Sequence, residues 1–495
     1  MAETPKDQTD EKAKKSLKYS ILDGFFYSMM VGFGESFLGA FAVFLKATNG
    51  QIGLIGSLPQ ALGSLSQLLS RRVMRLLNSR KKIVLFGALI SALMYIPITL
   101  AFFLGKASVP LLLLFVCVYW ISTTIIGPAW SSWMGDIVNK NERGTYFGRR
   151  NKIAGFATFF SFIAAGYLLQ QFGGSEIHQY IGYVIIFAIA MASRILSFIS
   201  LSLQYEPAYH DDPDAYFSFI DFIKKAPFNN YGMFVLYSAF MNFGVFISTA
   251  FFTAYILRDI RFSYLEYTLI QAAAILMKNL SMPIWGKAMD RFGARKVLTL
   301  AGFTMPLVPI LCTLSRSFWY LVGVQLYSGL VWAAFDLAIF TFVFDVTTPQ
   351  KRASCVAYFN VLNGAAMLAG ALIGGFILAH LPEGALGSKF LVLFLIGGIL
   401  RYMSSLIFLP KIREVRTVEP IPYHVLFFNV LTTIPSTSGI VFNFAQGLEK
   451  LPQLPVRMVK EISDITNELT AEIRARAAER RERRKARHEK QQRKK

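Results

Sequence analysis

The feature that most constrains the fold of this sequence is a series of apolar blocks, each about 20 to 28 residues long, separated by short polar joints. A helix needs about 20 apolar residues to cross the core of a bilayer. The chain is 54% hydrophobic and 16% charged, against roughly 25% charged in an ordinary soluble domain. One soluble core could not bury so many apolar residues, so we predict an all-α polytopic membrane protein.

The apolar blocks and the residues that interrupt them predict twelve transmembrane helices in two pseudo-symmetric six-helix bundles. We expect these helices near residues 21–46, 51–70, 83–104, 109–137, 151–172, 180–204, 231–257, 264–288, 297–314, 318–346, 353–380 and 388–410.

The basic residues predict how the helices are oriented. The start of the chain (MAETPKDQTDEKAKK) has no apolar core and no small-residue cleavage site, so we expect no removable signal peptide. If the amino terminus is inside, three inner joints carry fifteen basic residues and all six outer joints carry six. This is the positive-inside bias, and it predicts that both termini are cytoplasmic.

The predicted helices divide the chain into six parts. We expect a cytoplasmic amino-terminal tail at 1–20, a first bundle at 21–204, a polar cytoplasmic linker at 205–230 and a second bundle at 231–410. Two apolar runs too short to span the membrane follow at 411–455, where we expect an interfacial segment. A basic cytoplasmic tail at 456–495 completes the chain.

The two predicted bundles repeat one another in sequence. DIVNKNERGTYFGRRN places Arg143 seven residues after Asp136, and DVTTPQKRASCVAYFN places Arg352 seven residues after Asp345. Both residues of the second pair lie 209 positions after their equivalents. Parallel repeats related by an axis along the membrane normal are a known transporter architecture.

The basic tail suggests a lipid partner. Its last part, 474–495, carries a local charge of +9, and basic residues near an anionic leaflet each contribute roughly 1 kcal/mol of attraction. A solvated, partly disordered tail remains the alternative. The overall charge of +21 does not indicate nucleic-acid binding, because the basic residues lie in joints and in the tail, not on a folded basic domain.

No pattern of residues indicates an enzyme, a metal site or a cofactor. The three cysteines lie far apart, and the five histidines are isolated. HExxH, P-loop, GxSxG and dinucleotide glycine patterns are missing. We therefore predict no catalytic residue and no direct use of ATP.

The most specific motif is WGKAMDRFGARKV, between the eighth and ninth predicted helices. It resembles the signature of the major facilitator superfamily, a glycine, three residues, Asp-Arg, one residue, glycine and then basic residues. The matching residues are Gly286, Asp290, Arg291, Gly293 and Arg295. The resemblance implies a cytoplasmic gating motif, in which the glycines permit a tight turn and close helix approach.

The equivalent joint between the second and third helices departs from that signature. RRVMRLLNSRKKI keeps the basic residues but has Leu76 at the position of the aspartate and Ser79 at that of the second glycine. The resemblance covers roughly residues 18 to 412. It extends to the joint between the fourth and fifth helices, which is similar to that of bacterial members and implies a bacterial inner membrane.

Ionisable residues inside the apolar blocks are candidate functional groups, because each costs about 2.5 kcal/mol or more at the membrane centre unless it is paired or hydrated. Glu35 lies near the middle of the first helix, which lines the central cavity in the superfamily. A carboxylate removed from water can hold or release a proton near neutral pH. Glu35 is our first candidate for proton coupling, with substrate binding and a structural hydrogen bond as alternatives.

Asp336 and Lys278 form a second candidate site in the other bundle. Both lie in predicted membrane interior, on the tenth and eighth helices. They either neutralise one another or face the cavity, where Asp336 would take a proton or a substrate cation and Lys278 a substrate anion. The superfamily's tenth helix lines the cavity, which favours Asp336 as the second proton-coupling candidate.

Two further arginines, Arg194 and Arg401, occupy equivalent positions in the sixth and twelfth helices. We expect both to pair with carboxylates or helix ends near Asp136 and Asp345 and to have a structural role in gating. The candidate cavity walls, on the first, fourth, seventh and tenth helices, combine aromatic rings with a few polar groups, which suits an organic ligand. These residues are Tyr27, Trp120, Thr124, Trp130, Tyr237, Asn242, Phe246 and Trp332.

Together these features predict a monomeric secondary active transporter that moves a small organic solute by alternating access, coupled to protons. Two alternatives remain open. One is a membrane sensor or assembly factor with the same fold that acts through its basic tail, and the other is a lipid flippase.

Overall fold

In the computed structural model of the chain, residues 5–138, 143–207, 219–347, 349–382 and 387–415 are described. Within these ranges every regular element is a helix, and no strand occurs. The predicted all-α fold is therefore confirmed. The predicted interfacial segment at 411–455 lies outside the described residues from 416 onward, and the predicted basic tail at 456–495 lies outside them completely.

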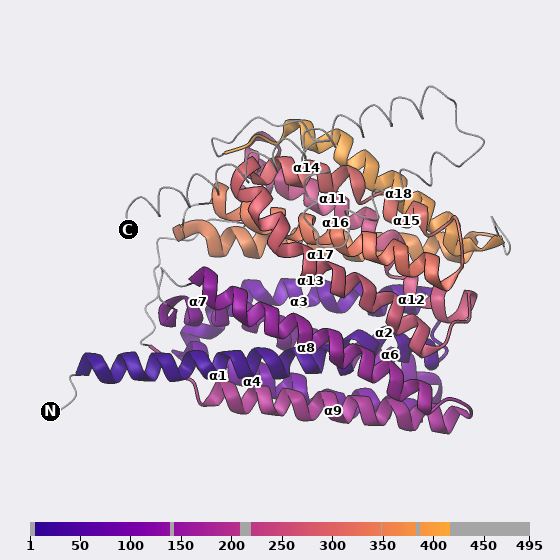
Figure 1. The fold of residues 1–495 in the computed structure, drawn as a ribbon, viewed down its shortest axis with the longest axis horizontal. Coiled ribbons are helices and arrows are strands. Elements are labelled where there is room, and N and C mark those ends of the chain that lie inside the picture. Colours follow the sequence, from indigo (N-terminus) through magenta and orange to yellow (C-terminus); the bar gives the residue numbers. More distant parts are fainter. Residues whose placement is uncertain (1–4, 139–142, 208–218, 348, 383–386, 416–495) are drawn as a thin grey trace, which may run out of the picture. The chain divides into compact units, whose positions relative to one another are not determined.

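The described residues of the first half form six helical stretches, several of them broken into two or three pieces, which Figure 1 follows from indigo to magenta. Their elements are α1 (Pro5–Phe33), η1 (Glu35–Phe37), α2 (Leu38–Phe44), α3 (Asn49–Leu77), α4 (Arg80–Leu93), α5 (Tyr95–Leu100), η2 (Ala101–Ala107), α6 (Ser108–Thr124), α7 (Ile126–Ile137), α8 (Arg143–Gln171) and α9 (Glu176–Ser202).

The second half, within the described ranges, forms six more long stretches, preceded by two short helices. Its elements are α10 (Phe219–Lys225), η4 (Ala226–Phe228), α11 (Asn230–Thr249), α12 (Phe252–Ala254), η5 (Tyr255–Asp259), α13 (Tyr264–Phe292), α14 (Ala294–Thr304), α15 (Leu307–Leu311), α16 (Phe318–Val346), α17 (Pro349–His380), α18 (Lys389–Phe408) and η7 (Leu409–Lys411).

The helices lie near the predicted apolar blocks, but three of them extend well beyond these blocks. The first begins at Pro5 rather than at residue 21, α3 ends at Leu77 rather than at residue 70, and α8 begins at Arg143 rather than at residue 151, because the adjoining polar residues are also helical. The predicted linker at 205–230 contains the short helices α10 and η4 within its described part.

Ten stretches of the described chain are long and apolar enough to cross a membrane. The other two long helices, α3 and α13, are more polar, and each contains a proline, Pro59 or Pro283. Both pack against the opposite half of the chain, α3 against α17 and α13 against α8. Their lower hydropathy follows from this position, because helices that face protein need fewer apolar side chains than helices that face lipid.

The start of α4 is held by a carboxylate from beyond the end of α9. Ser79 caps the helix by accepting a hydrogen bond from the Lys82 backbone N–H. Glu206 accepts hydrogen bonds from the Arg80 N–H at 2.6 Å, the Lys81 N–H at 3.0 Å and the Ser79 hydroxyl at 2.7 Å. The first N–H groups of a helix have no partner inside it, and an anion is favoured there by the helix dipole.

The second half uses the same arrangement at the start of α14. Glu414, which follows α18 as Glu206 follows α9, accepts a hydrogen bond from the Arg295 N–H at 2.8 Å. In both halves, a glutamate in the segment after the sixth helix therefore links that helix by hydrogen bonds to the amino end of the third helix. The repeat in the sequence is thus also a repeat in tertiary structure.

We predict that Glu206→Ala lowers the free energy of unfolding by about 1 kcal/mol, because it leaves two N–H groups at the start of α4 without their anionic acceptor. The shift is measured as the thermal unfolding midpoint of the purified protein in detergent. Glu176→Ala is the control: Glu176 pairs with Lys46, but their side chains are 56% and 80% exposed, so its effect should stay below about 0.5 kcal/mol. Equal shifts in the two variants would contradict the assignment.

Candidate functional site

Glu35 lies at a break in the first membrane helix. α1 ends at Phe33, and Glu35 begins the short 3-10 helix η1. Gly34 is needed at the break, because a Cβ atom there would overlap the Tyr95 ring. The Glu35 side chain is half-buried, and its Oε2 accepts a hydrogen bond of 2.8 Å from the Tyr119 hydroxyl.

Two buried tyrosines and a methionine surround this carboxylate. The Tyr95 and Tyr119 rings are 5.5 Å apart, and each hydroxyl lies 3.0 Å from the Met30 sulfur. A hydroxyl has only one proton to donate, and an ionised carboxylate is a far stronger acceptor than a thioether sulfur. Tyr119 can therefore bond to Glu35 when it is ionised and turn toward Met30 when it is not.

A second carboxylate, Asp23, lies on the same helix and was not among the predicted site residues. Asp23 is 4% exposed. Its Oδ1 accepts a 2.7 Å hydrogen bond from Ser197, and its Oδ2 lies 3.2 Å from Arg150 Nη2. Arg150 also lies over the Trp130 ring, 4.4 Å from its centre. An acidic residue within the apolar run SILDGFFY was the sequence signal for this site.

Arg194 connects Asp23 to the predicted cavity wall. Its guanidinium donates hydrogen bonds to Ser197 at 3.0 Å and Ser91 at 2.9 Å, and it lies 4.9 Å from the centre of the Tyr27 ring. Because Ser197 donates to Asp23, one hydroxyl joins Arg194 to that carboxylate.

Arg194 and Arg401 were predicted to pair with carboxylates or helix ends near Asp136 and Asp345. This prediction is wrong, because both arginines bind other groups. Asp136, at the end of α7, pairs with Arg80 at 2.5 Å. Arg401 is 2% exposed and donates hydrogen bonds to α11, including one of 2.8 Å to the Ser248 hydroxyl and two to the Gly244 and Val245 carbonyls. Burial within each bundle keeps both arginines away from the helix ends, so serines and backbone carbonyls become their acceptors.

Lys278 and Asp336 form an ion pair, as the first of the two predictions for them stated. Lys278 Nζ of α13 lies 2.6 Å from Asp336 Oδ2 of α16, and each side chain is 37% exposed. Pairing reduces the penalty of placing two charges in apolar surroundings. The remaining exposure leaves both groups accessible to a proton or a polar ligand.

The predicted cavity walls fall into two groups. Tyr237 and Asn242 are 0% and 8% exposed and pack inside the second half, where Asn242 donates a 2.6 Å hydrogen bond to Asn363. They leave almost no surface for a ligand in this structure. The half-buried members are Tyr27, Trp120, Thr124, Trp130, Phe246 and Trp332.

The predicted gating motif forms the turn between α13 and α14. Gly293 has a φ of 88°, which favours glycine, so the predicted tight turn occurs there. The explanation of Gly286 by close helix approach is wrong, because a Cβ atom at this position would be 3.8 Å from its nearest neighbour, Leu337. In the first half, Asn78 takes the positive φ, 46°, and Ser79 becomes the helix cap.

Several residues of the motif have side chains outside the described part of the structure. These are Asp290, Arg291, Arg143 and Arg352. Asp345 lies one residue before the end of α16 and is half-buried.

The two halves touch beside η1. The Phe37 ring lies 6.4 Å from that of Tyr267 on α13, and Arg258 donates a 3.1 Å hydrogen bond to the Val43 carbonyl. Further along α3, Asn360 of α17 donates a 2.8 Å hydrogen bond to Gln67. By the predicted orientation, the contacts beside η1 lie toward the outer side of the membrane.

Comparison with known proteins gives a family match over most of the chain. Residues 24–255 and 233–424 match the family model described as Major Facilitator Superfamily. The tetracycline resistance protein, class B, of Escherichia coli is 28% identical over 157 residues, which is 31% of this chain and 36% of that protein. The match thus spans about a third of the relative's length.

Solved structures share the fold at low identity. A mutant form of the nucleoside transporter NupG aligns with a TM-score of 0.64 and 16% identity, covering 81% of this chain and all of that one. The D-xylose-proton symporter aligns with a TM-score of 0.61 and 12% identity, covering 82% and 99%.

We predict that Asp336→Asn and Lys278→Gln each destabilise the protein by about 1 to 2 kcal/mol, because each leaves one uncompensated charge that is only partly solvated. The double variant should recover most of this loss, since no charge remains. Thermal unfolding of the four proteins gives the coupling energy as a double-mutant cycle. A double variant as unstable as the sum of the single variants would show that the two groups do not stabilise one another.

Proposed function

Because this chain belongs to the major facilitator superfamily, we propose that it is a secondary active transporter whose two halves rock around a substrate site between them. Membership of this family makes the protein a transporter rather than an enzyme, and its apolar helices make it an integral membrane protein. We propose that it is a monomer in a bacterial inner membrane. Both termini would be cytoplasmic, as the basic inner joints predict.

Coupling to protons rests on the surroundings of Glu35. Its hydrogen bond from Tyr119 is strongest while the carboxylate is ionised, and Tyr119 has Met30 as a second acceptor. The site can therefore change its bonding when a proton arrives, without leaving a buried donor unpaired. A proton symporter among the structures of the same fold supports this mode of coupling.

The substrate we propose is a small organic solute. Half-buried aromatic side chains such as Trp120 and Trp332 offer flat apolar contacts, and the Lys278–Asp336 pair offers charges of both signs. Transporters of a nucleoside and of a sugar share the fold. We place Asp336 second to Glu35 as a proton carrier, because its carboxylate is already neutralised by Lys278.

The contacts beside η1 bear on the state of the transport cycle. Phe37 and Tyr267 belong to different halves and pack together at the predicted outer end. We infer that this structure corresponds to a state closed on that side.

The test uses the purified protein in liposomes that contain a pH-sensitive dye. Nucleosides, sugars, amino acids, organic acids and amphipathic cations are added in turn, and the internal pH is followed. We predict a substrate-dependent pH change for the wild type and its loss in Glu35→Gln, because the amide cannot carry a proton. Tyr119→Phe should keep transport but alter its dependence on pH.

Glu176→Gln is the matched control, since it makes the same chemical change at an exposed surface pair. It should transport like the wild type. A Glu35→Gln variant that gives the wild-type pH response would remove Glu35 from the coupling mechanism, and the same assay on Asp336→Asn would then test the second candidate.

A further inference from the structure

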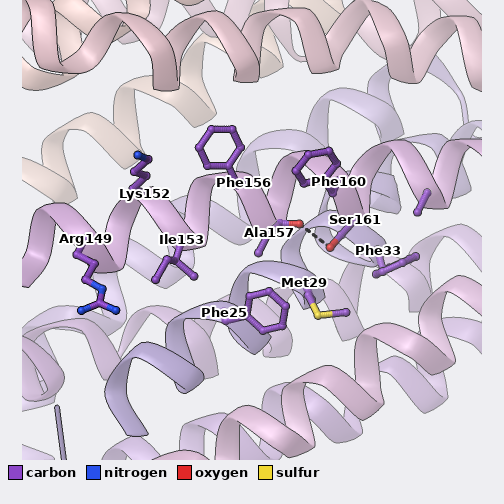
Figure 2. A pocket seen from close by; sticks show the side chains of 11 residues that line it. Phe25, Met29, Phe33, Arg149, Lys152, Ile153, Phe156, Ala157, Phe160 and Ser161 are labelled. Atoms are coloured by element: carbon purple, nitrogen blue, oxygen red, sulfur yellow. Dashed lines mark hydrogen bonds between the residues drawn. The ribbon is translucent and has the colours of Figure 1, made fainter. Parts of the chain in front are cut away.

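A cavity of about 730 Å³ lies between α1 and α8, two helices of the first half, and its lining includes neither Glu35 nor the Lys278–Asp336 pair. Figure 2 shows Phe25 and Met29 of α1 directed toward α8, with Arg149 and Lys152 at one end of the cavity and Phe160 toward the other. We call this cavity the α1/α8 groove. Its walls are almost completely apolar apart from the two basic residues.

The α1/α8 groove is straight because the two helices run in parallel in one register. The Tyr146 hydroxyl donates to the Leu17 carbonyl, and Thr158 donates to the Ser28 carbonyl. The first bond joins residues 129 positions apart and the second joins residues 130 positions apart, so the register is nearly constant along the two helices. Apolar side chains at every third or fourth position of each helix therefore form two facing rows.

The groove does not include the side of α8 that packs on the second half of the chain. α8 meets α13 through another side, where Phe162 packs on Tyr267 with ring centres 6.3 Å apart. In the groove lining, Phe160 is 64% exposed, and Leu22, three residues before the lining residue Phe25 on α1, is 45% exposed. Large exposed apolar side chains on a membrane-spanning helix indicate a surface covered by lipid.

The basic end of the groove lies at the predicted cytoplasmic side. Arg149 and Lys152 are exposed, and within the described part of the chain no hydrogen bond or ion pair involves either side chain. Their neighbour Arg150 differs, since it is bound to Asp23 and to the Ser20 carbonyl. Lys18 of α1 is also exposed and lies near this end, beside Leu17, whose carbonyl is bound by Tyr146.

We propose that the α1/α8 groove binds an anionic phospholipid of the inner leaflet. The phosphate would lie against Arg149 and Lys152, and one acyl chain would follow the apolar rows. The lining of α8 extends from Arg149 to Ala164, which is about 22 Å along a helix and enough for a chain that crosses half of a bilayer core of about 30 Å. A free anion would contact only the two basic side chains and would leave the apolar walls of the groove unoccupied. The combination of charge and apolar walls therefore favours a lipid.

The test is native mass spectrometry of the full-length protein with phosphatidylglycerol or phosphatidylcholine of matched acyl chains. We expect phosphatidylglycerol to bind more tightly to the wild type. Arg149→Gln/Lys152→Gln should weaken phosphatidylglycerol binding at one site by roughly tenfold to thirtyfold. Lys224→Gln/Lys225→Gln removes the same charge from exposed positions of α10 and should bind like the wild type.

A second variant tests the apolar part of the groove without changing its charge. Ala164→Phe fills the end far from Arg149, so it should weaken binding of a long-chain phosphatidylglycerol and leave a short-chain analogue unaffected. Unchanged phosphatidylglycerol binding in Arg149→Gln/Lys152→Gln, or an equal loss in the α10 control, would overturn the proposal. The same conclusion would follow if Ala164→Phe affected both chain lengths equally.

Discussion

The structure depends on a partner for each charged group that enters the apolar interior, because lipid offers no water to solvate it. Asp23 is held by Arg150 and Ser197, and Lys278 by Asp336. Each pair joins two helices, so it also determines how these helices are rotated about their axes. The polar groups that are expensive to bury thus specify the arrangement of helices whose apolar faces would pack in many ways.

The two halves have the same architecture but differ in the groups that pair with their buried polar groups. At the bundle ends the pairing is the same, since Glu206 and Glu414 both bind the amino end of the third helix of their half. In the interior they diverge, because Arg194 binds serines whereas Arg401 also binds backbone carbonyls of α11. A helix end always offers unpaired N–H groups, so its partner can repeat, but an interior partner depends on neighbouring side chains that differ between the halves.

The sequence predicts the parts of this structure that depend on local pattern. In the described part of the chain, ten membrane-spanning stretches follow from apolar length, and the tight turn follows from Gly293, whose positive φ suits glycine. The Lys278–Asp336 pair was one of two open predictions for those residues. The bond from Arg194 to Ser91 and the bonding of Glu206 were not predictable, because they depend on contacts between segments more than 100 residues apart. Asp23 was missed because it lies near the end of an apolar block, where a charge is usually solvated.

The break in the first helix places a protonatable group beside the contact between the halves. η1 is three residues long and contains both Glu35 and Phe37. Glu35 is bonded within the first half through Tyr119, whereas Phe37 packs against Tyr267 of the second. A change in the hydrogen bond to Glu35 would act on η1, a short segment that lies outside the continuous backbone hydrogen bonds of α1. In the proposed mechanism, proton binding at Glu35 would be coupled to separation of the Phe37–Tyr267 contact through a single turn of backbone, and alternating access requires such a linkage.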